Sequence, residues 1–306
     1  QMYLQALLSQ ALRALGHGTL QARLPFVALA WLTVLLLYVF VRTEFEDTGM
    51  AAAAALLLSV NSYWILHARQ CRYYAMSSFF LLLTFAAWAR WRRGAKLGGA
   101  AFVAAAWLWF QSDFGSFWPA IAVLLAAAAI EDWPRWKAPA AVAACLFAAV
   151  GPWVWYYQLA NRYKPAQRNW WWRFLGNLHQ MNQFVLPLIV LLAAAVLVWR
   201  LRASLPAGQT RMLASGLAII STMFFWVPSV APVFFLRYVV QLVPLSCILA
   251  AWVAFRLFHR IGGAYGARRP WLRAAATAAA IAFFAVCPLL SAPVAWLVPR
   301  KGIVDH

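Results

Sequence analysis

Two arginines that lie three residues apart carry the clearest chemical signal in the sequence. Arg69 and Arg72 belong to the segment 67–74, which separates two apolar stretches. An arginine at the centre of a bilayer costs about 2.5–3.5 kcal/mol on the insertion scale, so we expect both residues to have a specific role. Guanidinium groups bind phosphate oxygens through paired hydrogen bonds. The segment therefore predicts a phosphate site at a membrane surface.

The geometry of this segment depends on whether the helix continues. A helix running through it would place Arg69, Arg72 and Tyr73 on one face. The alternative is a simple interfacial anchor, in which the arginines extend to the membrane surface and the tyrosines lie at headgroup level.

A second arginine–tyrosine pair, Arg237 and Tyr238, begins a later apolar stretch, and Pro244 follows six residues on. Arg237 is the only basic residue between Arg211 and Arg256 in the sequence. It is a candidate second cation for the same headgroup. A single interfacial anchor is the alternative.

The segment 158–182 is the longest predicted outer loop. It contains the run Arg-Asn-Trp-Trp-Trp-Arg over 168–173, followed by His179. Aromatic rings beside polar groups suit a sugar, whose faces are apolar and whose rim carries hydroxyls. The same composition suits an interfacial helix lying flat among headgroups.

Asp113 lies in a short outer turn, 111–116, and is the only carboxylate expected on the outer side apart from Asp305. A carboxylate there could act as a general base or orient a cation. An aspartate that forms the turn before Gly115 is the alternative.

The elements that must position these residues are predicted to be membrane-spanning helices. The chain is 65% hydrophobic and 11% charged, with a mean hydropathy of +0.71. Apolar segments long enough to cross about 30 Å of hydrocarbon recur throughout. We predict an all-α, polytopic transmembrane bundle that forms one domain over 1–306, with 1–22 as an interfacial helix. The ten predicted spans are 24–41, 50–66, 73–89, 97–111, 114–130, 138–157, 183–199, 212–228, 237–255 and 274–291.

Charge predicts the orientation of these spans. The chain has 26 Lys+Arg against 7 Asp+Glu and a net charge of +19. The larger share of basic residues falls in alternate loops, which are cytoplasmic by the positive-inside rule. Arg69, Arg72, Asp113 and Arg237 then lie on the outer face. Basic residues in short loops reflect topology and anionic lipid, so nucleic acid is not an expected partner.

Other ionisable residues narrow the function classes. None of the seven acidic residues lies in the middle of a predicted span, which argues against ion-coupled transport. The four cysteines and five histidines lack metal-ligand spacing, so neither a metal nor another cofactor is expected. The chain begins with Gln1, and a start outside the membrane is easiest to explain if one further span precedes it. We therefore expect the sequence to be N-terminally truncated.

Three motifs in order resemble the GT-C membrane glycosyltransferases of the dolichyl-phosphate-mannose–protein mannosyltransferase and aminoarabinose transferase type. The matching segments are Ala-Arg-Leu-Pro at 22–25, Ala-Arg-Gln-Cys-Arg-Tyr-Tyr-Ala-Met at 68–76, and Arg237-Tyr238 with Pro244. The resemblance implies a polyprenyl-phosphate-linked sugar as donor and a lipid, glycan or protein as acceptor. It also implies a multi-pass protein of the bacterial inner membrane whose active site faces the periplasm.

The resemblance also implies roles for individual residues. The predicted donor-phosphate site consists of Arg69, Arg72, Tyr73, Tyr74, Arg237 and Tyr238. Arg168, Trp171 and His179 are expected on the sugar or acceptor side.

The chain departs from the family pattern at the catalytic acid. That acid lies in the family's first outer loop, which is absent here, so the main acid is expected upstream of Gln1. Gln70 stands where the second motif usually has a glutamate, and Asp113 is the reserve acid.

Two other function classes remain open. A polyprenyl-phosphate-sugar flippase or binding protein would use the same arginines without a base. An O-antigen polymerase or ligase also handles polyprenyl-linked glycans at the outer face. An acidic residue directly after one further N-terminal span would favour the transferase.

Overall fold

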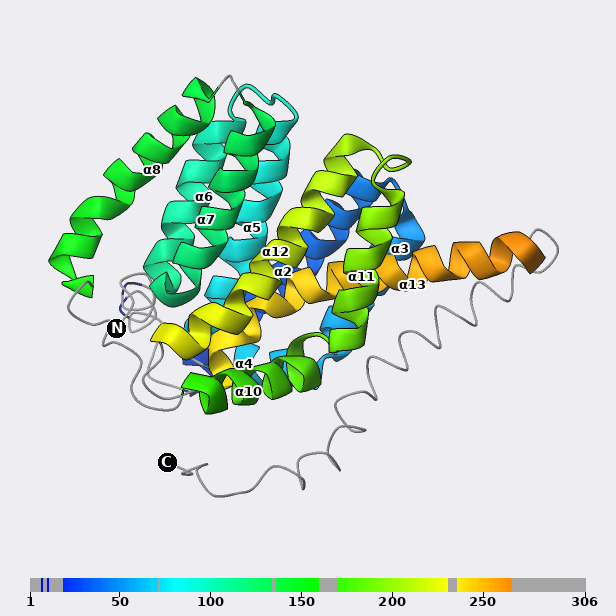
Figure 1. The fold of residues 1–306 in the computed structure, drawn as a ribbon. Helices are drawn as coiled ribbons and strands as arrows, with labels where there is room; N and C mark the ends of the chain where they lie inside the picture. Colours follow the sequence, from blue (N-terminus) through cyan, green and yellow to red (C-terminus); the bar gives the residue numbers. More distant parts are fainter. Residues whose placement is uncertain are drawn as a thin grey trace.

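The described residues fold entirely into helices and the turns between them (Figure 1). The computed structural model describes residues 19–70, 72–133, 136–159, 170–230 and 236–265, together with Leu7 and Gln10. Within these ranges there is no β-strand, which confirms the all-α prediction for this part of the chain. Most of the predicted interfacial helix 1–22, and the last predicted span 274–291, lie outside the described residues.

The helices follow one another with short connections. The first half contains α2 (Thr19–Phe45), α3 (Thr48–Val60), α4 (Ser62–Ala68), α5 (Tyr74–Arg92), α6 (Gly98–Ser112), α7 (Phe114–Glu131) and α8 (Lys137–Tyr156). The second half contains α10 (Trp170–Gln180), the π-helix η1 (Met181–Val185), α11 (Leu188–Leu201), α12 (Ala207–Val230), the 3-10 helix η2 (Leu236–Leu242) and α13 (Val243–Tyr265).

Several of these helices are long and apolar enough to cross a membrane. Among the described residues five pass on their own, namely Arg23–Phe45, Phe114–Glu131, Lys137–Tyr156, Ala207–Ser229 and Tyr238–Leu257. Two bent pairs raise the number to seven if each counts as one span. The protein is therefore an all-helical protein with five to seven candidate membrane spans.

The difference from ten predicted spans has identifiable causes. Two predicted spans, 50–66 and 183–199, correspond to the bent pairs, whose helices turn by 64° and 81° at the break. Helix α6 has 15 residues, fewer than a span of about 20 needs. Helix α5 has 19 residues, but serines near one end and arginines at the other lower its hydropathy. The count of ten stays a prediction.

Asn61 causes the break between α3 and α4. Its extended backbone ends α3, and its side-chain oxygen accepts a hydrogen bond of 2.8 Å from the backbone N–H of Trp64, so it caps α4. Helix α4 then ends at Ala68, and a non-helical turn leads to Tyr74. The helix does not continue through Arg69 and Arg72, so the same-face arrangement that a continuous helix would give is absent.

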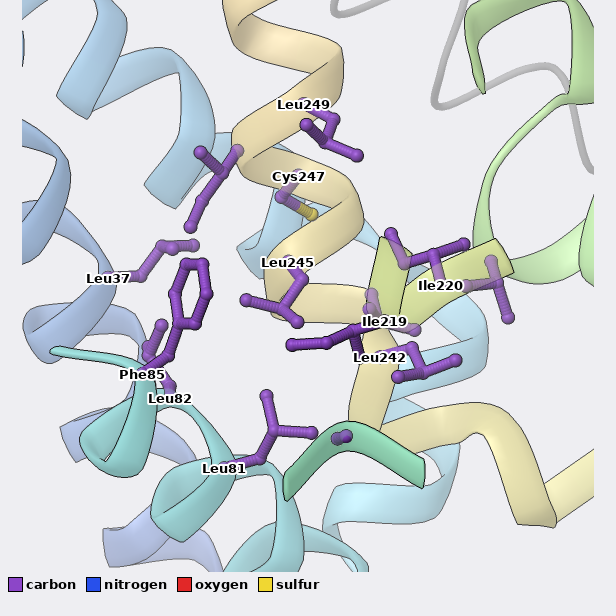
Figure 2. Close-up of a cluster of buried hydrophobic side chains, with 14 of the residues drawn as sticks. Leu37, Leu81, Leu82, Phe85, Ile219, Ile220, Leu242, Leu245, Cys247 and Leu249 are labelled. Atoms are coloured by element: carbon purple, nitrogen blue, oxygen red, sulfur yellow. The ribbon is translucent and has the colours of Figure 1, made fainter. Parts of the chain in front are cut away.

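The core forms where α2, α5, α12, η2 and α13 meet. Figure 2 shows Leu37 of α2, Phe85 of α5, Ile219 of α12 and Leu245 of α13 around one apolar centre. In the α13 span 83% of residues are buried, against 17% in α8. Helix α13 is thus central, whereas α8 lies at the rim, in contact with α6 and α7.

One end of the bundle, which we call the ion-pair end, gathers charged residues from helices far apart in the sequence. Arg92 bonds both carboxylate oxygens of Asp132 at 2.7 and 2.8 Å and reaches Glu131 at 3.1 Å. Arg211 also pairs with Glu131, at 3.1 Å, and Arg93 pairs with Glu44 at 2.8 Å. The sequence assigned these residues to one side of the membrane, and they lie together. That this side is cytoplasmic stays a prediction.

The opposite end, which we call the Asp113 end, carries α4, the α6–α7 turn, α10 and η2. Helix α10 runs across this end of the bundle, as Figure 1 shows. The segment 158–182 thus contains a helix where a loop was predicted. Its apolar residues at positions 170, 174, 178 and 181 recur at helical spacing, which is the pattern of the interfacial-helix alternative.

Candidate functional site

Asp113 is the centre of a buried polar cluster at the Asp113 end. It caps α7, and its Oδ1 accepts a hydrogen bond of 3.0 Å from the backbone N–H of Gly115. Its Oδ2 accepts hydrogen bonds from Ser116 Oγ at 2.5 Å and from Ser77 Oγ at 3.3 Å. Ser77 belongs to α5, so the cluster joins three helices around one carboxyl group. The side chain is almost entirely buried, with 8% of the residue exposed.

The environment of Asp113 disfavours its charge. No ion pair reaches this carboxyl group from the described residues. Burial raises the pKa of the Asp113 carboxyl, although the hydrogen bonds from Ser116, Gly115 and Ser77 oppose the shift. A carboxyl with a raised pKa is suited to proton transfer near neutral pH. The same hydrogen bonds also stabilise the turn, so Asp113 has a structural role besides any chemical one.

Gln111 lies two residues before Asp113 and is 1% exposed. Neither its amide nitrogen nor its amide oxygen has a hydrogen-bond partner among the described residues. The side-chain oxygen of the buried Gln241, three residues after Tyr238, likewise has none. An unpaired buried polar group costs about 1–3 kcal/mol. These amides are therefore candidates to bind a polar ligand beside Asp113.

Arg69 and Arg72 lie in the turn between α4 and α5, and both side chains are exposed. Arg69 is the C-cap residue of α4, and its backbone N–H donates to the carbonyl of Ile65 at 3.2 Å. No carboxylate pairs with either guanidinium group in the described part of the chain. These cations are therefore available to an anion from outside the protein.

The two predicted tyrosine donors differ in exposure. Tyr74 is 1% exposed, and its ring packs against His67 at 5.3 Å and Tyr73 at 4.6 Å. Tyr73 is half-buried and lies directly beside Arg72. His67 Nδ1 donates to the backbone carbonyl of Tyr63 at 2.9 Å, because a carbonyl oxygen only accepts. Tyr74 thus supports the turn by packing, and Tyr73 is the better placed of the two to meet a headgroup.

Arg237 and Tyr238 begin η2, which packs against both α4 and α5. The backbone of this predicted second cation therefore belongs to an element next to the Arg69–Arg72 turn. The side chain of Arg237 lies outside the described part. Tyr238 is half-buried, and its carbonyl accepts a hydrogen bond of 2.7 Å from Gln241 Nε2.

The three residues predicted on the sugar or acceptor side do not form one described cluster. Arg168 lies outside the described residues. Trp171 is 68% exposed at the start of α10, whereas His179 is half-buried near its end. They are eight residues apart, which is about 12 Å along a helix. Trp171 alone presents an open aromatic face.

Ser77, Ser116 and Gln111 are members of the cluster that sequence reasoning missed. Ser116 follows Asp113 by three residues, a spacing typical of local capping turns, so its contact had a readable signal. Ser77 and Asp113 are 36 residues apart, and their contact depends on the neighbour relation between α5 and α7. No group of three or more potential metal ligands occurs among the described residues.

Comparisons with protein-family models, with curated proteins and with solved structures give no match to this chain. The glycosyltransferase resemblance therefore rests on the three sequence motifs, and function has to be argued from the site.

Proposed function

We propose that this protein is a membrane glycosyltransferase that takes its sugar from a polyprenyl-phosphate-linked donor. One observation carries the proposal. The exposed guanidinium groups of Arg69 and Arg72 have no carboxylate partner in the described structure, and they lie at the end of the bundle that also holds Asp113.

The contrast between the two ends supports an anionic ligand. At the ion-pair end Arg92 and Arg211 share Glu131, and Arg92 also binds Asp132. The cations there are neutralised within the protein. At the Asp113 end two exposed arginines remain for an external anion, and arginine binds phosphate with two parallel hydrogen bonds.

The reaction has four parts. A nucleophilic group of the acceptor attacks the anomeric carbon of the sugar, and a bond forms between them. The bond from that carbon to the phosphate oxygen breaks, and the oxygen keeps the electron pair. Arg69 and Arg72 stabilise the charge that develops on the leaving polyprenyl phosphate. The proton of the acceptor passes to a base.

Asp113 is the candidate base within the described chain. The other described carboxylates lie at or near the ion-pair end or in the α2–α3 connection. Burial raises the Asp113 pKa, which makes the ionised carboxyl a stronger base. Gln111, with its unpaired amide, would orient a sugar hydroxyl beside it.

The test uses purified full-length protein in vesicles with a labelled polyprenyl-phosphate sugar. Arg69→Ala and Arg72→Ala should each lower donor turnover about 10- to 100-fold, because a hydrogen bond to a charged group contributes about 1.5–3 kcal/mol. The matched control is Arg200→Ala, which removes an exposed arginine from the end of α11. Wild-type turnover in both site variants, or an equal loss in the control, would contradict the proposed phosphate site.

A flippase or binding protein is the second candidate, and the burial of Asp113 favours it. A carboxyl group that is 8% exposed and caps a helix is poorly placed to reach an acceptor. The two functions differ in their products. A transferase releases polyprenyl phosphate, whereas a flippase moves the intact donor between leaflets. Transport of the donor without release of polyprenyl phosphate would establish the second function.

A further inference from the structure

An open groove runs between α6 and α8 at the ion-pair end. Its volume is about 940 Å³, at the upper end of the roughly 300–1,000 Å³ of ligand pockets. It is lined by Trp91 from α5, by Lys96 from the α5–α6 turn, by one face of α6 from Gly99 to Trp107, and by one face of α8 from Ala141 to Ala149.

Small residues create the groove. Gly99, Ala100 and Ala104 face it from α6, and Ala141 and Ala149 face it from α8. At Gly99 the helices come close, because an added Cβ would lie 3.3 Å from Val142 Cγ2. Alanine side chains elsewhere leave the space between the two helices unfilled.

The groove has one basic end. Lys96 lines it there, in a turn that Gly94 makes possible by adopting a φ of +81°. Lys137 begins α8 four residues before Ala141, which places it on the same helix face one turn nearer this end. Neither lysine has an ion pair among the described residues, whereas the nearby Asp132 is bound by Arg92.

The length of the groove matches one membrane leaflet. The α6 wall from Gly98 to Trp107 is about 14 Å long at about 1.5 Å per residue. Half of a hydrocarbon core of about 30 Å is about 15 Å. The apolar walls therefore extend from the basic end to about the middle of a bilayer, which is the depth that one acyl chain occupies.

We propose that this groove binds an anionic glycerophospholipid, with its phosphate at Lys96 and Lys137 and an acyl chain between α6 and α8. A neutral lipid would leave the lysines unpaired, and a helix of another protein would place apolar surface against them. Basic pockets between membrane helices are known to bind acidic headgroups. The groove lies at the end opposite Arg69 and Arg72, so this proposal is independent of the proposed transferase activity.

Native mass spectrometry of the purified full chain provides the test, with phosphatidylglycerol and phosphatidylcholine as probes. We expect wild type to retain phosphatidylglycerol preferentially, and Lys96→Ala and Lys137→Ala each to weaken that preference about fivefold. Ala104→Leu and Ala141→Leu, which fill the groove from exposed positions, should weaken binding of both lipids.

Two controls decide whether the effect belongs to the groove. Arg200→Ala removes a cation at the end of α11, and Ala195→Leu enlarges an exposed residue on that helix. Neither should change lipid retention. Equal loss in Arg200→Ala, no preference for phosphatidylglycerol in wild type, or a dimer that Ala141→Leu disrupts would overturn the proposal.

Cys145 offers a second measurement, because it is an exposed thiol that lines the groove. In a chain whose other three cysteines are changed to serine, phosphatidylglycerol should slow alkylation of Cys145 more than phosphatidylcholine does. Lys96→Ala should remove this difference. Equal protection by both lipids in the presence of Lys96 would overturn the headgroup assignment.

Discussion

Asp113 shows how one residue combines a structural role with a candidate chemical one. It accepts two side-chain hydrogen bonds and one backbone hydrogen bond in a position that is almost closed to solvent. Because burial raises the pKa of its carboxyl, the folded protein holds a proton there more tightly than the unfolded chain does. This group therefore stabilises the fold below the ordinary aspartate pKa of about 3.9. The contribution is lost as the pH rises through the raised pKa.

Asp113→Asn should remove this pH dependence. The wild-type melting temperature in detergent should fall more between about pH 4 and about pH 8 than that of the variant, because only wild type has a carboxyl to ionise there. Ser112→Ala is the control, since Ser112 is buried next to Asp113 but bonds to Leu108. It should keep the wild-type slope. Equal slopes for wild type and Asp113→Asn would show that Asp113 ionises freely in the folded protein.

Arg92 is the residue that joins the helices at the ion-pair end. Its side chain is 9% exposed and contacts Asp132 and Glu131, and its carbonyl accepts a hydrogen bond from Arg211. Arg92→Ala should lower the free energy of unfolding by about 1–3 kcal/mol, because it leaves two carboxylates short of hydrogen bonds. Denaturant or thermal unfolding of the purified protein measures this. Arg90→Ala removes an exposed arginine two residues away and should change stability by less than about 0.5 kcal/mol.

At the scale of elements, α10 is held to the bundle by one buried amide and a stack of rings. Asn177 Nδ2 donates to the carbonyls of Met223 and Phe224 in α12, at 3.1 and 3.0 Å. Phe174 stacks on Trp170 and on Phe225 with centroid distances of 5.2 and 5.4 Å. The opposite face exposes Trp171, Trp172 and Leu175. Helix α10 is therefore amphipathic, with its inner face docked and its outer face apolar and open.

Asn177→Ala should loosen α10 without unfolding the bundle. We expect amide hydrogen exchange over Trp170–Gln180 to speed up about tenfold, since loss of these hydrogen bonds costs about 1–3 kcal/mol locally. Gly176→Ala is a matched control on the same helix, because an added Cβ there meets nothing within 4 Å. It should leave exchange unchanged or slow it, as alanine favours helix over glycine by about 1 kcal/mol. Unchanged exchange in Asn177→Ala would show that ring stacking alone holds α10.

The sequence predicts elements better than it predicts their neighbours. Long apolar runs located α2, α7, α8, α12 and α13, because continuous hydrophobicity is a local property. The break at Asn61 had a local signal too, an asparagine followed by serine at a helix start. Contacts between helices carry no such signal. The Ser77–Asp113 and Trp226–Gly115 hydrogen bonds depend on which helices pack together, and apolar surfaces of similar composition do not specify that.

The candidate site illustrates the same limit. Arg69 and Arg72 could be selected from sequence because two charges between apolar runs are unusual. The burial of Tyr74, the docking of η2 beside α4 and the unpaired amide of Gln111 could not be, since each follows from packing over long sequence distances. Sequence thus indicated the cations of the site, and the structure adds the polar cluster behind them.

At the scale of the whole molecule, the position of α8 at the rim has a mechanical consequence. Its 20 residues are about 30 Å long, close to the thickness of a bilayer's hydrocarbon core. Neighbouring helices restrain it on one side only, so α8 is the span most free to tilt when the surrounding membrane becomes thinner. A tilt of α8 away from α6 widens the space between them, so this rim helix couples bilayer thickness to the shape of the molecule's edge.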